Sequence, residues 1–190
     1  MQTPAVRVSP EQYFALDEAS DEKVEYYDGT AVAMAGASPR HNLVAGNVYL
    51  ALRGALDPRG CYVAQADQRT RLSTTRAWVY PDVVVSCAPR FEGPRPQSLI
   101  NPELVVEVLS GSTAAHDLSG KLAHYRATDS ITEIVFVHLS QRLIEHHHRI
   151  EPAKWVVTLV REHQVELAGI GASVAVDAVY TGMDRLPADE

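Results

Sequence analysis

The spacing of apolar residues predicts three main helices between short strands. A serine followed by a proline stands before two of them, at Ser9-Pro10 and Ser38-Pro39. This pair is typical of a helix N-terminus, because serine caps the first turn and proline fits its first position. We therefore expect helices over residues 10–19 and 39–56, and a third over residues 116–127. In the second helix the apolar stripe recurs at helical spacing, at Val44, Val48, Ala51 and Ala55.

Strands are indicated by short runs rich in valine and aromatic residues, bounded by turn residues. An Asp28-Gly29 turn between two such runs predicts a β-hairpin over residues 23–34. Further strands are expected at residues 62–66, 68–72, 79–86, 104–109, 131–138, 143–148, 155–161 and 164–167. A proline-rich loop is expected over residues 89–102, and an irregular segment over residues 169–180.

The order of these elements predicts a mixed α/β fold. A strand, a helix and a further strand follow one another over residues 104–138, which indicates a strand-helix-strand crossover. We expect a mixed central β-sheet flanked by helices, with an N-terminal helix and hairpin and extra C-terminal strands. A length of 190 residues is usual for one domain, so residues 1–190 are predicted to form a single domain.

Composition and charge narrow the class of protein. No apolar run approaches the roughly 20 residues of a membrane span, and the N-terminus lacks the apolar core of a signal peptide, so we expect no membrane partner and a cytoplasmic location. The formal net charge of −7 excludes a protein coated in positive charge. Arg69 and Arg71 alternate, and they either form a local basic groove or are scattered surface arginines. Cys61 and Cys87 are expected to be free, buried thiols in a reducing compartment.

Two carboxylates stand inside apolar strands, Asp82 in the run over residues 79–86 and Glu107 in the run over residues 104–109. Carboxylates are rarely buried unless they are paired or bound to a cation. On neighbouring strands they would repel by about 1 kcal/mol at 4 Å in water, and by about four times as much within a protein. A divalent cation removes this repulsion, and hard carboxylate oxygens favour Mg²⁺ or Mn²⁺ over zinc.

A lysine is the third member of the predicted set. A nuclease site of the type Pro-Asp, then Asp/Glu-x-Lys, needs a lysine two residues after the second acid, on the same face of the strand. That position holds Leu109 here. Lys121 could replace it if the third helix folds back over the end of the strand, and it shares a helix face with Asp117 and Tyr125.

These residues resemble a known family, the putative restriction endonuclease (Uma-two) family of the PD-(D/E)XK nuclease superfamily. The likeness covers about residues 10–140. The segments that carry it are Pro81-Asp82, residues 102–110, Ser112-Thr113, Asp117, Lys121, Tyr125, residues 25–29, Met34, His41 and residues 132–137. Gly111 departs from the family pattern, which usually has proline there, and so does His138, where aspartate is usual.

The resemblance implies a restriction-endonuclease-like core and an endonuclease that uses Mg²⁺ or Mn²⁺ to hydrolyse phosphodiester bonds, with DNA as the expected partner. Asp82 and Glu107 would hold the ion, and the Val108 carbonyl would complete its shell. Lys121 would orient or deprotonate the attacking water, or stabilise charge on phosphorus.

Three further candidates and one aromatic residue have weaker support. Asp117 either caps the helix or positions Lys121. Glu25 and His41 are candidates for the site, although Glu25 could equally face solvent. Tyr125 is expected to pack in the core rather than to take part in chemistry.

Two other functions stay open. One is a catalytically inactive module that binds nucleic acid or protein on the same fold, which the acidic net charge and Leu109 favour. The other is a structural α/β protein whose carboxylates pair with arginine. A homodimer is expected, because the extra C-terminal strands have edges to cover. The run from Glu145 to His148 is predicted to be a solvated strand without metal, because successive residues point to opposite faces.

Overall fold

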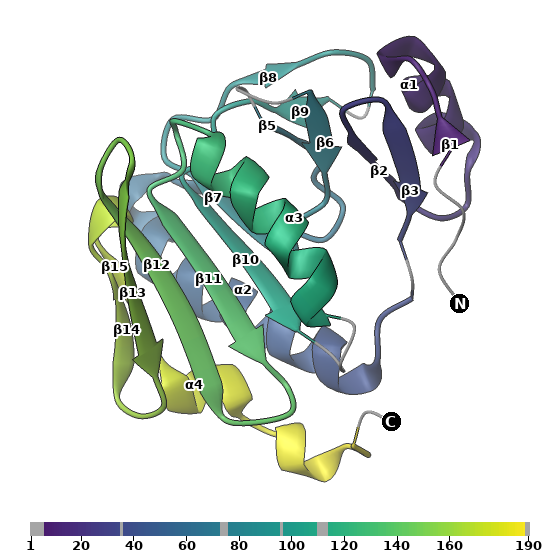
Figure 1. Ribbon diagram of the computed structural model, residues 1–190. Helices are drawn as coiled ribbons and strands as arrows, with labels where there is room; N and C mark the ends of the chain where they lie inside the picture. Colours follow the sequence, from purple (N-terminus) through teal and green to yellow (C-terminus); the bar gives the residue numbers. More distant parts are fainter. Residues whose placement is uncertain (1–5, 35, 73–75, 96, 110–113, 189–190) are drawn as a thin grey trace.

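The structure is a computed structural model of the 190-residue chain. It describes residues 6–34, 36–72, 76–95, 97–109 and 114–188, and for Val6 and residues 114–119 it describes the backbone alone. Two large mixed β-sheets stand next to one another and helices cover their faces (Figure 1). The predicted mixed α/β class is confirmed, but the strands form two large sheets where one central sheet was expected.

The N-terminal elements form as the local sequence predicts. Helix α1 (Pro10–Ala19) begins at Ser9, whose hydroxyl accepts from the Gln12 N–H while the Gln12 side chain accepts from the Ser9 N–H. Strands β2 (Val24–Tyr27) and β3 (Thr30–Ala33) form the hairpin. Its turn has φ values of 49° at Asp28 and 95° at Gly29, the positive angles that an Asp-Gly turn adopts.

The first sheet has seven short strands in the order β1-β3-β2-β6-β5-β9-β8. Two of them, β8 and β9, lie in the segment expected to be a loop. The strands not yet given are β1 (Val6–Arg7), β5 (Thr70–Leu72), β6 (Ala77–Val79), β8 (Phe91–Glu92) and β9 (Ser98–Leu99).

The second sheet has six strands in the order β13-β12-β11-β10-β7-β4. Its strands are β4 (Tyr62–Gln65), β7 (Val83–Ser86), β10 (Leu104–Leu109), β11 (Glu133–His138), β12 (Leu143–Glu151) and β13 (Lys154–Val160). Strands β10 and β11 are parallel, and α3 (Ala114–Ala127) connects them as the predicted crossover. The other neighbouring pairs are antiparallel.

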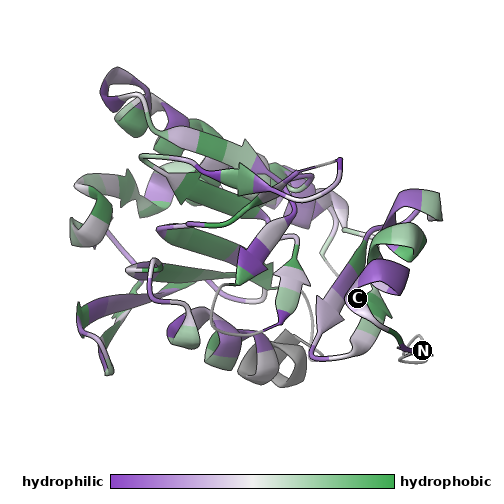
Figure 2. Ribbon diagram, turned by 90° about the horizontal axis from the view of Figure 1, so that it is seen from above, coloured by the Kyte–Doolittle hydropathy of each residue, from purple (hydrophilic) through white to green (hydrophobic). Residues whose placement is uncertain are grey.

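Alternate residues of β10 point into two different cores. Val106 and Val108 pack on the side of α2 (Pro39–Leu56), whereas Val105 packs on the side of α3 with Tyr125. Glu107 has the parity of Val105, so its side chain points toward α3. Hydrophobic residues dominate the central strands (Figure 2).

The C-terminal segment is more regular than expected. After the 3₁₀ turn η2 (Ala168–Ile170), β15 (Ala172–Ala175) pairs with β14 (Gln164–Leu167), and a short helix α4 (Val176–Tyr180) and the turn η3 (Met183–Arg185) follow. This segment packs against α2, which follows a stripe four residues apart from Val44 to Leu56. The predicted position Ala55 is wrong because it is exposed, and Leu56 is buried beside it; Ala51 is partly buried and packs against the core next to the fully buried Leu52.

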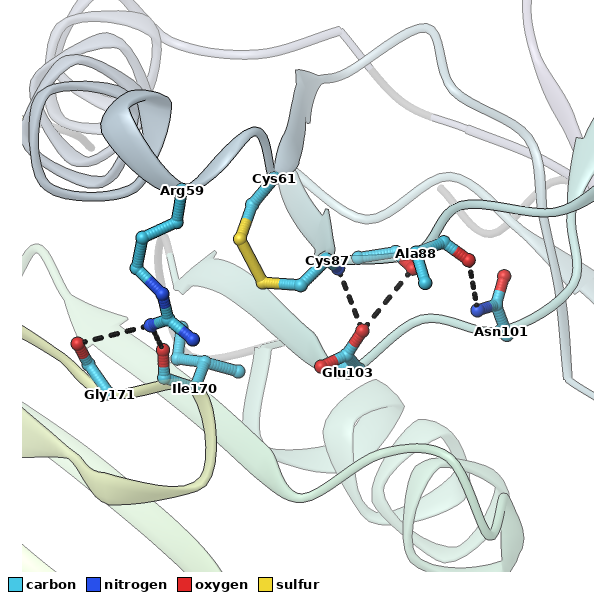
Figure 3. Close-up of a disulfide and its surroundings, with 9 residues drawn as sticks. Arg59, Cys61, Cys87, Ala88, Asn101, Glu103, Ile170 and Gly171 are labelled. Carbon is cyan, nitrogen blue, oxygen red and sulfur yellow. Dashed lines mark hydrogen bonds between the residues drawn. A yellow bond between two sulfur atoms is a disulfide. The ribbon is translucent and has the colours of Figure 1, made fainter.

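Cys61 and Cys87 form a disulfide, so the prediction of two free thiols is wrong. The two residues flank β4 and β7, whose register sets Tyr62 opposite Ser86 and therefore brings the neighbouring cysteines together. Close by, the Cys87 N–H donates to Glu103 and the Arg59 guanidinium donates to the carbonyls of Ile170 and Gly171 (Figure 3).

Candidate active site

Asp82 lies where the chain passes from one sheet to the other. The predicted strand over residues 79–86 is divided here: β6 ends at Val79 in the first sheet and β7 begins at Val83 in the second. In the second sheet Val83 stands opposite Val106 of β10, so Asp82 continues the register opposite Glu107. The Val108 N–H donates to Asp82 Oδ2 over 2.7 Å. The two acids therefore come together as predicted.

Glu107 is buried, with only 7% of the residue exposed. Its Oε1 atom accepts a hydrogen bond from the Tyr125 hydroxyl and contacts Lys121 Nζ at 3.2 Å. Burial and, to a smaller extent, the neighbouring carboxylates of Asp82 and Glu25 together raise the pKa of Glu107 to about 7, against the opposing effects of Lys121 and Tyr125. A carboxyl with such a pKa exchanges its proton near neutral pH, which is typical of functional sites.

Lys121 of α3 lies between two carboxylates. Its Nζ atom is 2.9 Å from Glu25 Oε1 and 3.2 Å from Glu107 Oε1. Burial acts to lower the pKa of Lys121, but the carboxylates of Glu107 and Glu25 outweigh it and raise the pKa well above its usual value. The lysine is therefore a fixed positive charge at neutral pH, and the helix folds back over the strand as predicted.

Glu25 comes to the site from β2 of the other sheet. It is 5% exposed, so the alternative in which it faces solvent is wrong. Its Oε1 accepts from the Tyr80 N–H over 3.0 Å and its Oε2 accepts from the Tyr27 hydroxyl over 2.7 Å. Glu25 therefore brings a side chain of the first sheet into contact with Lys121, one of the candidate catalytic residues.

His41 lies in the first turn of α2, where the Ser38 hydroxyl accepts from its N–H over 3.1 Å. Its Nε2 atom is 3.1 Å from Asp82 Oδ2, and both side chains are largely buried. The helix cap therefore places the imidazole against the first acid.

The structure thus gathers five of the six predicted catalytic residues, namely Glu25, His41, Asp82, Glu107 and Lys121. The side chain of the sixth, Asp117, lies outside the described residues. The Tyr125 hydroxyl contacts Glu107, so this residue does more than pack as expected. Tyr27, which contacts Glu25, lies in the segment over residues 25–29 that carries the resemblance, but it was not among the predicted site residues.

Three carboxylates and one lysine meet here, which leaves an excess of negative charge. Among the described residues no group of three or more His, Cys, Asp and Glu side chains is arranged to hold a metal ion. A cation at Asp82 and Glu107 would need further oxygen ligands from the backbone and from water. Mg²⁺ tolerates this, because it usually keeps several waters and binds one or two carboxylates.

The two other charged features are structural. Arg69 is buried and lies 2.9 Å from Asp17, so it is not a surface arginine, whereas the side chain of Arg71 is partly exposed and pairs with Glu92. The expected solvated strand at Glu145–His148 is also wrong in part, since His146 and His147 are buried. Their partners are acids: His146 Nε2 is 2.6 Å from Glu133, and His147 Nε2 is 2.6 Å from Glu145.

Residues 10–177 match the family described as "Putative restriction endonuclease" (Uma2). The chain belongs to this family. It is 33% identical over 181 residues to the uncharacterized protein slr1290 of Synechocystis sp. (strain ATCC 27184 / PCC 6803 / Kazusa), which covers 95% of each chain. It is 27% identical over 157 residues to the uncharacterized protein sll1609 of the same organism, covering 82% of this chain and 89% of the other.

The fold is also similar to a solved structure, a putative nuclease belonging to DUF820 from Anabaena variabilis ATCC 29413. The TM-score is 0.69 at 11% sequence identity, and the match covers 86% of this chain and 93% of the other. At this identity the likeness supports the fold alone. Within the described residues, no helix has the length and apolar character to cross a membrane.

Proposed function

We propose that this protein is a metal-dependent endonuclease that hydrolyses phosphodiester bonds in DNA, with Asp82 and Glu107 as the ligands of Mg²⁺ or Mn²⁺. The main observation in support of this proposal is that the site holds three carboxylates but one lysine, so that negative charge is in excess there. The register of β7 and β10 sets the two acids opposite each other, and burial, together with the negative charges of Asp82 and Glu25, raises the pKa of Glu107. The partner we propose is DNA, together with a second copy of the chain.

The donor set suits a hard divalent cation. Carboxylate oxygens are the preferred ligands of Mg²⁺, and the Val108 carbonyl with water would complete the shell. When bound, such an ion would neutralise phosphate charge and lower the pKa of a bound water. The proton on Glu107 would be released on binding, since a ligand carboxyl must be ionised.

Lys121 would act as an electrostatic residue rather than a base. Its raised pKa keeps the ammonium protonated at neutral pH, so it has no free electron pair with which to accept a proton. A fixed positive charge beside Glu107 would stabilise negative charge that develops on phosphorus or orient the attacking water. His41 would hold Asp82 in place through its 3.1 Å contact with Oδ2.

The test is cleavage of plasmid and of single-stranded DNA by the purified chain with Mg²⁺, with Mn²⁺ and with chelator. Glu107→Gln should reduce metal-dependent cleavage by about 100-fold or more. The matched control is Glu166→Gln, because Glu166 is an exposed acid on β14. Circular dichroism checks that the variants fold. Cleavage that survives Glu107→Gln at the wild-type rate would exclude this site.

An inactive binding module is the second candidate. The observation that favours it is the close contact of Lys121 with both Glu25 and Glu107, because an ammonium at that position competes with a cation. Calorimetric titration with Mn²⁺ separates the two functions. Binding at micromolar to millimolar metal that Glu107→Gln abolishes supports the nuclease, whereas no binding at millimolar metal supports the module.

A further inference from the structure

One edge of the six-stranded sheet is formed by β13, which pairs with β12 alone among the described strands (Figure 1). Five of its seven residues are exposed, and the other two are half-buried. The strand is therefore not covered by the neighbouring β14–β15 hairpin. An edge of this kind presents a row of unpaired N–H and C=O groups to solvent.

The side chains of this edge are apolar on both faces. The exposed fractions of Val156, Val157 and Leu159 are 45%, 47% and 59%. Together with Ile150 of β12, these make up four of the seven large exposed hydrophobic residues in the described chain. Between Lys154 and Arg161 the strand has no charge and no proline, which are the usual protections of a free edge.

We propose that β13 pairs with β13 of a second copy of this chain in an antiparallel manner, so that the two six-stranded sheets become continuous. We take the binding partner to be a second copy because the sequence of β13 is complementary to itself when two copies run antiparallel. Residues opposite one another in an antiparallel pair point to the same face, so the two-fold axis must pass midway between a residue and its own copy. An isologous pair of this kind closes at two subunits.

The charged residues near the two ends of β13 select the register. With the axis at Thr158, a ladder that continues two residues past the end of β13 sets Lys154 opposite the partner's Glu162, which lies in the turn after the strand, and this pair of unlike charges occurs twice. The same register sets Val156 opposite the partner's Val160 and Val157 opposite the partner's Leu159. Opposite charges and β-branched pairs across strands are stabilising. An axis at Val157 would instead set Lys154 opposite Val160 and would leave both charged ends without a direct partner.

In the monomer Lys154 belongs to an exposed ion pair that does not prevent this pairing. Lys154 Nζ is 3.4 Å from Glu151 in its own chain, and both side chains are more than half exposed. An exposed pair of this kind contributes at most about 1 kcal/mol, so the lysine can exchange it for the partner's glutamate at little cost.

Size-exclusion chromatography with light scattering tests the proposal on the full chain between about 1 and 100 µM. The wild type should be a dimer at the upper concentrations, and Val157→Lys with Leu159→Lys should be a monomer, because this register sets lysine opposite lysine. Both side chains are exposed, so the fold should tolerate the change. The matched control is Leu16→Lys with Leu50→Lys, two exposed leucines on α1 and α2, which should stay dimeric.

A monomeric wild type at 100 µM would overturn the proposal, and so would a larger oligomer, a dimer that resists the β13 variant, or a control that dissociates equally.

The register has a test of its own. Lys154→Glu and Glu162→Lys should each raise the dimer Kd by about tenfold, and the double reversal should return it to within about twofold of the wild type. Absence of this rescue would exclude the register at Thr158. None of these outcomes depends on nuclease activity.

Discussion

At the scale of single residues, the protonation of Glu107 decides whether a cation can bind. Its pKa of about 7 results from burial and from the carboxylates of Asp82 and Glu25. The protonated form dominates below this pH and the ionised form above it. Metal binding selects the ionised form, so affinity must fall as the pH falls.

We therefore expect the apparent affinity for Mn²⁺ to be about tenfold lower at pH 6 than at pH 8, because the ionised fraction of a group with a pKa near 7 changes by about that factor. Calorimetric titrations at pH 6, 7 and 8 in buffers of different protonation enthalpy measure both the affinity and the released proton. An affinity that is constant over this range would contradict Glu107 as a ligand.

Tyr125 should act on metal binding through Glu107. Its hydroxyl donates to Glu107 Oε1, and this hydrogen bond lowers the pKa of the carboxyl against the larger effect of burial. Tyr125→Phe removes the donor, so the pKa should rise and the Mn²⁺ affinity at pH 7 should fall by about three- to tenfold, a loss that should shrink toward pH 9.

Tyr27→Phe is the matched control for that variant. It removes a hydroxyl donor from Glu25, which is not a proposed ligand. The pH profile of Mn²⁺ binding should therefore move much less than it does in Tyr125→Phe. Equal shifts in the two variants would contradict a specific role for Tyr125.

The sequence predicted the candidate site as far as the alternation of residues along strands and their spacing along helices determine it. Glu107 and Lys121 lie in elements whose bounds were predicted closely, so their side chains face each other as expected. The alternation of residues along β2 does not show which face of the strand is buried. Glu25 could therefore be interpreted as exposed to solvent. The role of the Tyr125 hydroxyl was missed because it depends on a distance between elements.

At the scale of elements, local sequence signals located the helices and the first hairpin because caps and turns act over a few residues. The strand expected over residues 79–86 shows the limit. Every residue between Val79 and Ser86 except Pro81 and Asp82 suits a buried strand, yet the chain changes sheet at this point. Pro81 lacks the N–H that a continuous ladder needs, and it was the available signal for the break.

The turn between β13 and β14 carries a local strain that can be removed. His163 has a φ of 63°, in the left-handed region that residues with a Cβ atom adopt at a cost. His163→Gly should raise the free energy of unfolding by about 0.5–1 kcal/mol, less than the full strain because glycine also increases the entropy of the unfolded chain. His163 is exposed, so little packing is lost.

Urea denaturation followed by circular dichroism measures this change. His163→Ala is the control, because alanine loses the imidazole but keeps the Cβ atom and hence the strain. A gain of equal size in the alanine variant would show that the side chain, rather than the backbone angle, is responsible.

At the scale of the whole molecule, the site depends on the meeting of the two sheets. Glu25 comes from the first sheet, Asp82 from the segment that joins the sheets, and Glu107 from the second sheet, while Lys121 comes from the helix packed between them. No local pattern predicts this meeting, because it results from long-range packing of two cores. The ordered set of residues was nevertheless visible in sequence, since each residue occupies a recognisable place in its element.

The disulfide is the feature of the whole chain that sequence reasoning interpreted wrongly. Two cysteines 26 residues apart do not reveal their distance, and the expectation of free thiols followed from the expected reducing compartment alone. The structure joins them across β4 and β7, the pair at one edge of the six-stranded sheet. Closing a loop of this length restricts the unfolded chain and should contribute about 3–4 kcal/mol to the free energy of unfolding.

Reduction of the wild type, or Cys61→Ser with Cys87→Ser, should therefore lower the free energy of unfolding by about 3–4 kcal/mol while leaving the fold intact. Urea denaturation with and without dithiothreitol measures the loss, and thiol titration of the native and denatured protein counts the free cysteines. The double serine variant is its own control, because reductant should not change its stability further. A wild type that releases two titratable thiols without reductant, or whose stability is unaffected by reductant, would contradict the bond between Cys61 and Cys87.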